Sequence, residues 1–154
     1  QDPPVLHRDI KPANIKLTPS GIIKLVDFGI TGLIGQVGRG KVQGTPYYIS
    51  PEVLMRRPVD HRADIYSLGA TLFHMLAAWP PFYGKTIDEV VKARFRTKAP
   101  DLKKVRPSLH AKTAQIVVRM LEVAPKNRYP DYEELLGDLE HVRGLIEMED
   151  FLYE

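Results

Sequence analysis

Residues 7–14 bring an acid, two cations and an amide into eight positions near the start of the chain. Asp9 is a carboxylate that can accept a proton, and Lys11 is a cation that can contact a phosphate. Asn14 adds an amide oxygen, which is among the hard oxygen ligands that magnesium accepts. This combination of residue types indicates chemistry on a phosphate with a metal ion close by.

Two short β-branched runs follow this cluster and predict a β-hairpin. The runs are residues 15–17 and 22–26, and Pro19 and Gly21 between them are typical of a turn. The tripeptide Asp27-Phe28-Gly29 follows the second run directly. Four glycines between residues 30 and 43 leave no helical or strand periodicity, so we expect a mobile loop there.

Beyond residue 50 the apolar residues recur at helical spacing. The pattern over residues 63–78 is apolar on nearly every face, which predicts a buried helix. Thr86 with Glu89, and Asp131 with Glu134, have the spacing of capping boxes and predict the starts of two more helices. We predict helices over 51–57, 63–78, 87–95 and 111–123, a polar connection after residue 95, and a last helix from residue 131.

These elements predict one mainly α unit, α+β overall. The 154 residues suit a single domain, and neither an internal repeat nor a Ser- or Gly-rich linker divides them. We expect a helical bundle around the buried helix 63–78, with the small β-hairpin at its front, catalytic edge.

The composition excludes several classes of protein. The absence of cysteine excludes disulfides and thiolate metal sites and is typical of a reducing compartment, so we expect a cytoplasmic protein. We find no signal segment and no apolar run near the roughly 18 residues of a membrane span, so we expect a soluble chain without a membrane segment. A net charge of +3 is too small to indicate nucleic acid as a partner.

The charges are unevenly placed along the chain. Seven basic residues and one acid lie between Lys92 and Arg106, whereas nine acids and one arginine lie between Asp131 and Glu154. Solvated surfaces that also attract each other explain such runs most simply. A docking patch for an acidic partner at Lys92 to Arg106 is the alternative.

Six landmarks resemble, in order and spacing, the C-terminal lobe of a protein kinase. Residues 7–14 match the catalytic-loop pattern H-R-D-L-x-x-x-N, with Ile10 in place of the commonest Leu. The resemblance covers nearly the whole chain and implies one kinase-domain lobe over residues 1–154. The other landmarks are Asp27-Phe28-Gly29, Gly44-Thr45, Ser50-Pro51-Glu52, Asp64 and Arg128.

Within this lobe the resemblance implies three segments. They are a catalytic loop at 7–14, an activation segment at 27–52 and a helical subdomain at 61–150. Lys11 and Thr45 resemble the serine/threonine class, and residues 11–17 are similar to bacterial members. The stretch 44–52 resembles the segment that holds a protein or peptide substrate.

The resemblance also implies a role for each candidate site residue. Asp9 would accept the proton of the substrate hydroxyl, Lys11 would hold the transferring phosphate, and the Thr45 hydroxyl would bond both. Asn14 and Asp27 would bind Mg²⁺, or Mn²⁺ in its place, against the phosphates of ATP. His7 and Phe28 would belong to a core column, Arg8 would contact a loop phosphate, and Glu52 and Asp64 would be buried carboxylates. The full set of supporting residues is His7, Arg8, Phe28, Gly29, Glu52, Asp64 and Arg128.

The support has specific expected contacts. Asp64 would accept hydrogen bonds from the backbone of the catalytic loop, because a buried carboxylate needs donors. Glu52 and Arg128 would form a buried ion pair. Two departures stand out: Lys16 lies where the family has an apolar adenine floor, and no Ser, Thr or Tyr lies between residues 32 and 44 to take a loop phosphate.

The parts of a kinase that precede the catalytic loop do not occur in this sequence. These are the Gly-rich loop, the strand lysine and the helix glutamate. We therefore expect an ATP-dependent protein serine/threonine kinase of which this piece alone is inactive, the N-terminal lobe lying outside it. A non-catalytic interaction module or pseudokinase lobe is the alternative, and retention of Asp9, Lys11, Asn14 and Asp27 argues against it.

Overall fold

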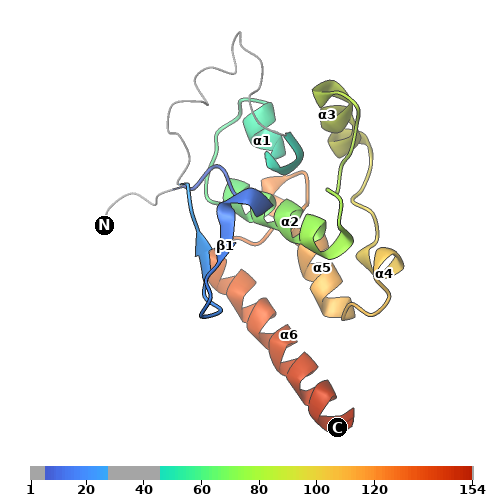
Figure 1. Cartoon of the computed structure of the whole chain (residues 1–154). Coiled ribbons are helices and arrows are strands. Elements are labelled where there is room, and N and C mark those ends of the chain that lie inside the picture. The colour runs from blue at the N-terminus through green and yellow to red at the C-terminus, as the bar shows by residue number, and fades with distance from the viewer. Residues whose placement is uncertain (1–5, 28–45, 154) are drawn as a thin grey trace.

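A computed structural model describes residues 6–27 and 46–153 of the chain. These residues form a helical body with a two-stranded antiparallel hairpin at one edge (Figure 1). The hairpin consists of β1 (Ile15–Leu17) and β2 (Ile23–Leu25). The helices are α1 (Pro51–Leu54), α2 (Arg62–Ala77), α3 (Ile87–Arg96), α4 (Leu102–Val105), α5 (Ala111–Met120) and α6 (Tyr132–Tyr153), and 3-10 turns lie at η1 (Pro12–Asn14), η3 (Pro46–Tyr48) and η4 (Pro125–Asn127).

Helix α2 crosses the middle of the molecule and confirms the predicted buried helix (Figure 1). Its Ile65, Tyr66, Ala70 and Phe73 have no exposed surface. It packs against α4, α5, η1 and η3, so four segments from different parts of the chain meet on it. A helix that is contacted on several sides has to be apolar nearly all round.

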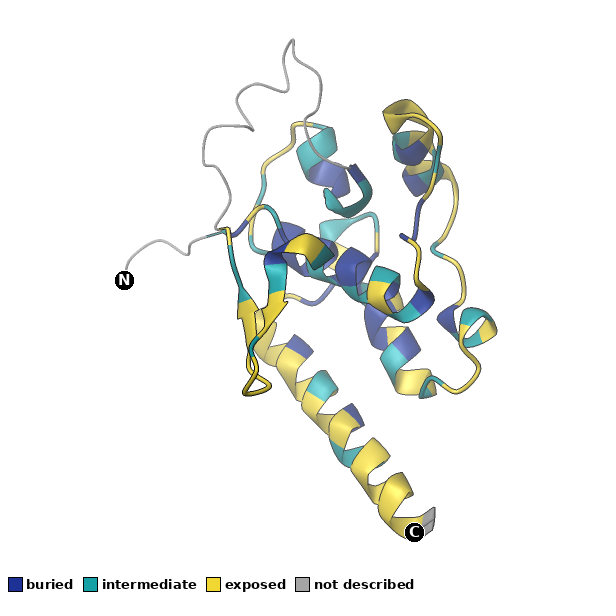
Figure 2. Ribbon diagram, in the orientation of Figure 1, coloured by how far each residue is buried: buried dark blue, intermediate teal, exposed yellow. Residues whose placement is uncertain are grey.

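Two apolar cores lie against α2 and join the other helices to it. One core unites Phe73 with residues of α3, α4 and α5, and the other unites Ile65 with residues of α5 and α6. The buried positions along α6 are confined to one stripe, whereas most of that helix is exposed (Figure 2). No helix in the described ranges is long and apolar enough to cross a bilayer.

The capping residues begin the helices where the sequence predicts. Thr86 Oγ1 accepts from the backbone N–H of Glu89 at 3.2 Å, and Asp131 Oδ1 accepts from that of Glu134 at 2.9 Å. The Glu89 carboxylate in turn accepts from the backbone N–H of Lys85, one residue before the cap. The predicted helices over 51–57, 63–78, 87–95 and from 131 are therefore confirmed, with ends shifted by a few residues.

Two details differ from the prediction. The connection after residue 95 contains the extra turn α4, which forms because Asp101 caps it and Leu102 is fully buried beneath it. Helix α5 ends at Met120 and not at residue 123. The chain turns there because the carbonyls of Glu122 and Val123 accept hydrogen bonds from Arg128.

Candidate active site

Helix α2 holds the loop of residues 7–14 through the carboxylate of Asp64. Its Oδ2 accepts from the backbone N–H of His7 at 2.7 Å, and its Oδ1 accepts from that of Arg8 at 2.9 Å. Asp64 is 4% exposed, so these two donors replace the water that the charge loses on burial. The expected contact between Asp64 and the loop backbone is thus present.

A second contact from α2 to the loop comes from Thr71. Its buried hydroxyl lies 3.4 Å from the carbonyl of Ile10, a long contact, and bonds the carbonyl of Ser67 at 2.8 Å. Thr71 follows Asp64 by seven residues, so both lie on the same face of the helix. No sequence motif named above includes Thr71. A polar side chain seven positions after Asp64 in a buried helix was the signal for it.

The loop brings Asp9, Lys11 and Asn14 into contact. Asp9 Oδ2 accepts from Lys11 Nζ at 2.8 Å and from Asn14 Nδ2 at 2.9 Å. Asn14 also bonds the Asp9 carbonyl at 2.8 Å. Asp9 Oδ1 accepts no hydrogen bond within the described part of the chain. Asp9 is therefore oriented through Oδ2, while Oδ1 can accept a hydrogen bond from another donor.

The hairpin then brings Asp27 close to Asn14. Ile15 pairs with Leu25, and beyond this pair the N–H of Val26 donates to the Asn14 carbonyl at 2.9 Å. Asp27 comes next in the chain, is exposed and has a left-handed backbone with φ of 58°. Asn14 and Asp27, whose side chains both offer oxygen ligands, are 13 residues apart in sequence and are thus carried to one edge of the molecule.

A buried ion pair ties the first turn of α1 to the turn before α6. Arg128 Nη1 and Nη2 bond the two Glu52 oxygens at 2.7 and 2.8 Å. Burial alone would raise the pKa of Glu52, but the hydrogen bonds and charge of Arg128 outweigh it and lower the pKa from 4.5. Arg128 also lies over the Tyr66 ring, 4.9 Å from its centroid. The expected Glu52–Arg128 pair is thus present.

Residues 2–138 match the family model of the protein kinase domain. The chain belongs to the protein kinase family. This match confirms the resemblance drawn from the landmarks, and the helical lobe with a small antiparallel sheet is the fold expected from it.

Bacterial serine/threonine kinases are similar to this kinase chain over most of its length. A probable serine/threonine-protein kinase of Clostridium perfringens is 32% identical over 142 residues, which cover 90% of this chain and 21% of the relative. The serine/threonine-protein kinase PknB of Mycobacterium tuberculosis is 35% identical over 145 residues, 91% and 23% of the two chains. A probable kinase of Streptomyces coelicolor is 36% identical over 141 residues, 88% and 21%. The chain thus spans little more than a fifth of these relatives.

Magnesium and ATP are typical of the kinase family, and the residues here suit them. The Asn14 side-chain oxygen accepts no hydrogen bond from a described residue, so it can serve as a ligand. In the described ranges no three His, Cys, Asp or Glu side chains gather to hold a metal by themselves. Magnesium in proteins commonly has one or two protein ligands, with phosphates and water as the others. Asn14 and Asp27 fit such a shared site.

Not all of the expected kinase site residues belong to the described part of the chain. Phe28, Gly29 and Thr45, and the loop between residues 30 and 43, lie outside the described residues. His7 is buried at 5% exposure, and Arg8 is exposed with φ of 65°. The packing of His7 on Phe28 and the bonds from Thr45 remain predictions.

The basic run from Lys92 to Arg106 differs from a single solvated surface. Arg94 is fully buried, and Lys103 donates its Nζ protons to the carbonyls of Pro107 and Leu109 at 2.6 and 2.7 Å. Only the remaining five cations are exposed. A docking patch for an acidic partner thus remains a prediction for those five alone.

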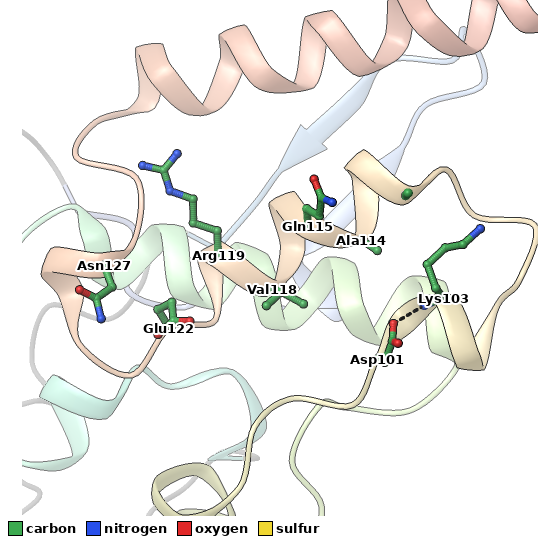
Figure 3. Close-up of a pocket in the computed structure, with 9 residues that line it drawn as sticks. Asp101, Lys103, Ala114, Gln115, Val118, Arg119, Glu122 and Asn127 are labelled. Carbon is green, nitrogen blue, oxygen red and sulfur yellow. Dashed lines mark hydrogen bonds between the residues drawn. The ribbon is translucent and has the colours of Figure 1, made fainter.

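The surface is hollowed beside α5. A cavity of about 650 Å³ lies along α5, between α4 and the η4 turn. Its lining mixes acids and bases such as Asp101, Arg119 and Glu122 with apolar side chains (Figure 3). None of the candidate site residues lines it, so it is separate from the site.

Proposed function

We propose that this chain is the C-terminal lobe of a protein serine/threonine kinase domain, which transfers the γ-phosphoryl group of MgATP to protein hydroxyls. In this proposal residues 1–154 include a catalytic loop at 7–14, an activation segment at 27–52 and a helical subdomain at 61–150. The observation that carries it is the contact of Asp9 with both Lys11 and Asn14, in a loop that Asp64 fixes to α2.

Asp9 acts on the substrate hydroxyl. Its Oδ2 is held by Lys11 and Asn14, so Oδ1 is available to accept the hydroxyl proton and to orient the oxygen toward phosphorus. Phosphoryl transfer depends mainly on such alignment and on neutralising phosphate charge. Lys11 has three N–H donors and uses one on Asp9, so it can contact a phosphate oxygen as well.

Asn14 and Asp27 hold the cation. When bound by these residues, Mg²⁺, or Mn²⁺ in its place, would supply positive charge against the phosphates. The bond between Val26 N–H and the Asn14 carbonyl keeps the two ligands at one edge of the lobe. Residues that precede this chain in the whole protein supply the other side of the ATP cleft.

The substrate is a protein or peptide, received by the stretch 44–52. We call the described part of it, residues 46–52, the substrate-binding segment. The absence of cysteine supports a cytoplasmic site of action. The five exposed cations between Lys92 and Arg106 suit an acidic partner.

Phosphotransfer by the full-length gene product from labelled ATP tests this function. Asp9→Asn should lower kcat about 100-fold or more, because the proton acceptor is lost while the volume is kept. Asp150→Asn, at an exposed position of α6, is the matched control and should leave kcat unchanged. Phosphotransfer that survives Asp9→Asn would remove Asp9 from this role. Nucleotide-independent partner binding without any transfer would support the pseudokinase alternative instead.

A further inference from the structure

Arg94 lies on α3 with its side chain wholly inside the protein, at 0% exposure. Its guanidinium donates three hydrogen bonds to main-chain carbonyls at 2.5 to 2.9 Å. Nη1 bonds Ile49, and Nη2 bonds both Pro46 and Tyr47. All three acceptors belong to the first four residues of the substrate-binding segment.

A buried cation is a costly way to fill a core position. Arg94 forms no ion pair with any described carboxylate, and burial lowers its pKa. An apolar side chain of similar volume would avoid the loss of hydration. What it could not supply is several N–H donors in a fixed plane. The carbonyls that Arg94 binds therefore account for its presence.

The main chain of residues 46–49 needs such a partner. It forms the single 3-10 turn η3 and then an extended connection to α1, so neither a strand nor a long helix satisfies its carbonyls. Buried carbonyls without a partner are destabilising. One guanidinium meets three of them and so fixes the path of four successive residues.

A second buried arginine holds the other end of the substrate-binding segment. Arg128 binds Glu52 there, and both guanidiniums contact the ring of Tyr66 on α2. The Cζ atoms of Arg94 and Arg128 lie 5.4 and 4.9 Å from its centroid. The segment is thus clamped at both ends over one side chain of the central helix.

We infer that Arg94 is a positioning residue for the protein substrate. It holds residues 46–49 in the conformation that receives the peptide beside the phosphoacceptor. This inference rests on the proposed kinase function and extends it to α3. The candidate nucleotide and metal ligands Asn14 and Asp27 lie on other elements. Among the described residues, the hydrogen bonds of Arg94 reach only 46, 47 and 49. Loss of Arg94 should therefore affect peptide binding and leave ATP binding unchanged.

Kinetics of the full-length gene product with a peptide substrate test the inference. We expect Arg94→Met and Arg94→Lys to raise the peptide KM about tenfold and to leave the ATP KM within about twofold, because a displaced segment misplaces the peptide alone. Arg143→Met is the matched control, since Arg143 is an exposed arginine on α6, outside the basic run. Its kinetics should equal those of the wild type. Hydrogen exchange at residues 47–50 should be faster in the Arg94 variants only.

Three outcomes would overturn the inference. They are an unchanged peptide KM in Arg94→Lys, an equal rise in the KM of ATP, and a loss of kcat at unchanged peptide KM. Arg94→Lys keeps the charge and the stem, so it decides the matter if Arg94→Met fails to fold. A wild type without Asp9-dependent transfer would reject the kinase function and the inference together. An active wild type whose Arg94 variants bind peptide normally would reject the inference alone.

Discussion

At the scale of single residues, two buried arginines solve two different problems. Arg128 neutralises a carboxylate, Glu52, that is 3% exposed. Both guanidiniums also bond three main-chain carbonyls, but Arg94 has no carboxylate partner among the described residues. Removing either side chain leaves buried polar groups without a partner, which costs far more than a lost surface contact.

The ion pair makes stability depend on pH. The pKa of Glu52 is lower in the folded chain than its ordinary value of 4.5, so its contribution is fully present above that value and is lost as pH falls through the folded pKa. In urea titrations from about pH 7 to 3, Glu52→Gln should be less stable at neutral pH but lose less stability on acidification. Parallel pH profiles for wild type and Glu52→Gln would contradict this pH dependence.

Arg128→Met should lower the free energy of unfolding by about 3 to 5 kcal/mol at pH 7.

At the scale of elements, Gly69 allows α2 and α5 to approach closely. A Cβ atom at this position would lie 2.6 Å from the Met120 Cβ and 3.4 Å from its carbonyl carbon. At this position the space between the two helices accommodates the hydrogen atom of glycine but not a methyl group.

We therefore expect Gly69→Ala to lower the free energy of unfolding by about 1 to 3 kcal/mol, because the clash outweighs the better helix propensity of alanine. Gly137→Ala on α6 is the matched control, since nothing lies within 4 Å of the added atom. It should raise the free energy of unfolding by up to about 1 kcal/mol. Urea unfolding measures both, and a stabilised Gly69→Ala would show that the helices can separate freely.

Helix α2 ends on a residue with an unfavourable backbone. Ala78 has a left-handed φ of 68°, and its N–H bonds the carbonyl of His74 at 2.8 Å. Glycine adopts this conformation without steric strain. Ala78→Gly should raise the melting temperature and increase the free energy of unfolding by about 0.5 to 1 kcal/mol, because the exposed methyl group makes no core contact. Ala93→Gly, inside α3, should do the opposite. Equal destabilisation by both would refute the explanation.

At the scale of the whole molecule, two apolar areas face solvent. The hairpin exposes Leu17 at 71% and Ile23 at 70%, and the end of α6 exposes Phe151 at 79% and Leu152 at 73% (Figure 2). Large exposed apolar side chains in groups promote association. Within the described ranges no third strand lies beside the hairpin, so its outer edges add main-chain groups that can pair with a second copy.

We expect this chain to self-associate as its concentration rises. Ile23→Thr should weaken the association, because it removes apolar surface and keeps the β propensity of the strand. Lys24→Thr on the same strand is the control and should not weaken it. Light scattering across a concentration series gives the mass, and a monomer throughout the series would contradict the prediction.

Much of the fold and the site was predictable because it depends on near neighbours in sequence. Capping at Thr86 and Asp131 and the hairpin turn each involve residues within a few positions. The contacts of Asp9 with Lys11 and Asn14 span only five residues. The contacts of Asp64 and of Glu52 with Arg128 are long-range, and the family resemblance alone predicted them.

The sequence by itself therefore determined the helices other than α4, the hairpin, the kinase family and the acid, cation and amide of the loop. The tertiary structure decided which polar residues turn inward. In a sequence Arg94 is one cation of a basic run and Thr71 one hydroxyl of a helix. Arg94 is buried because α3 packs against carbonyls 45 to 48 residues earlier, and Thr71 because the loop lies across α2. A side chain is buried by the segments that pack over it, and segments distant in sequence reach it only once the chain has folded.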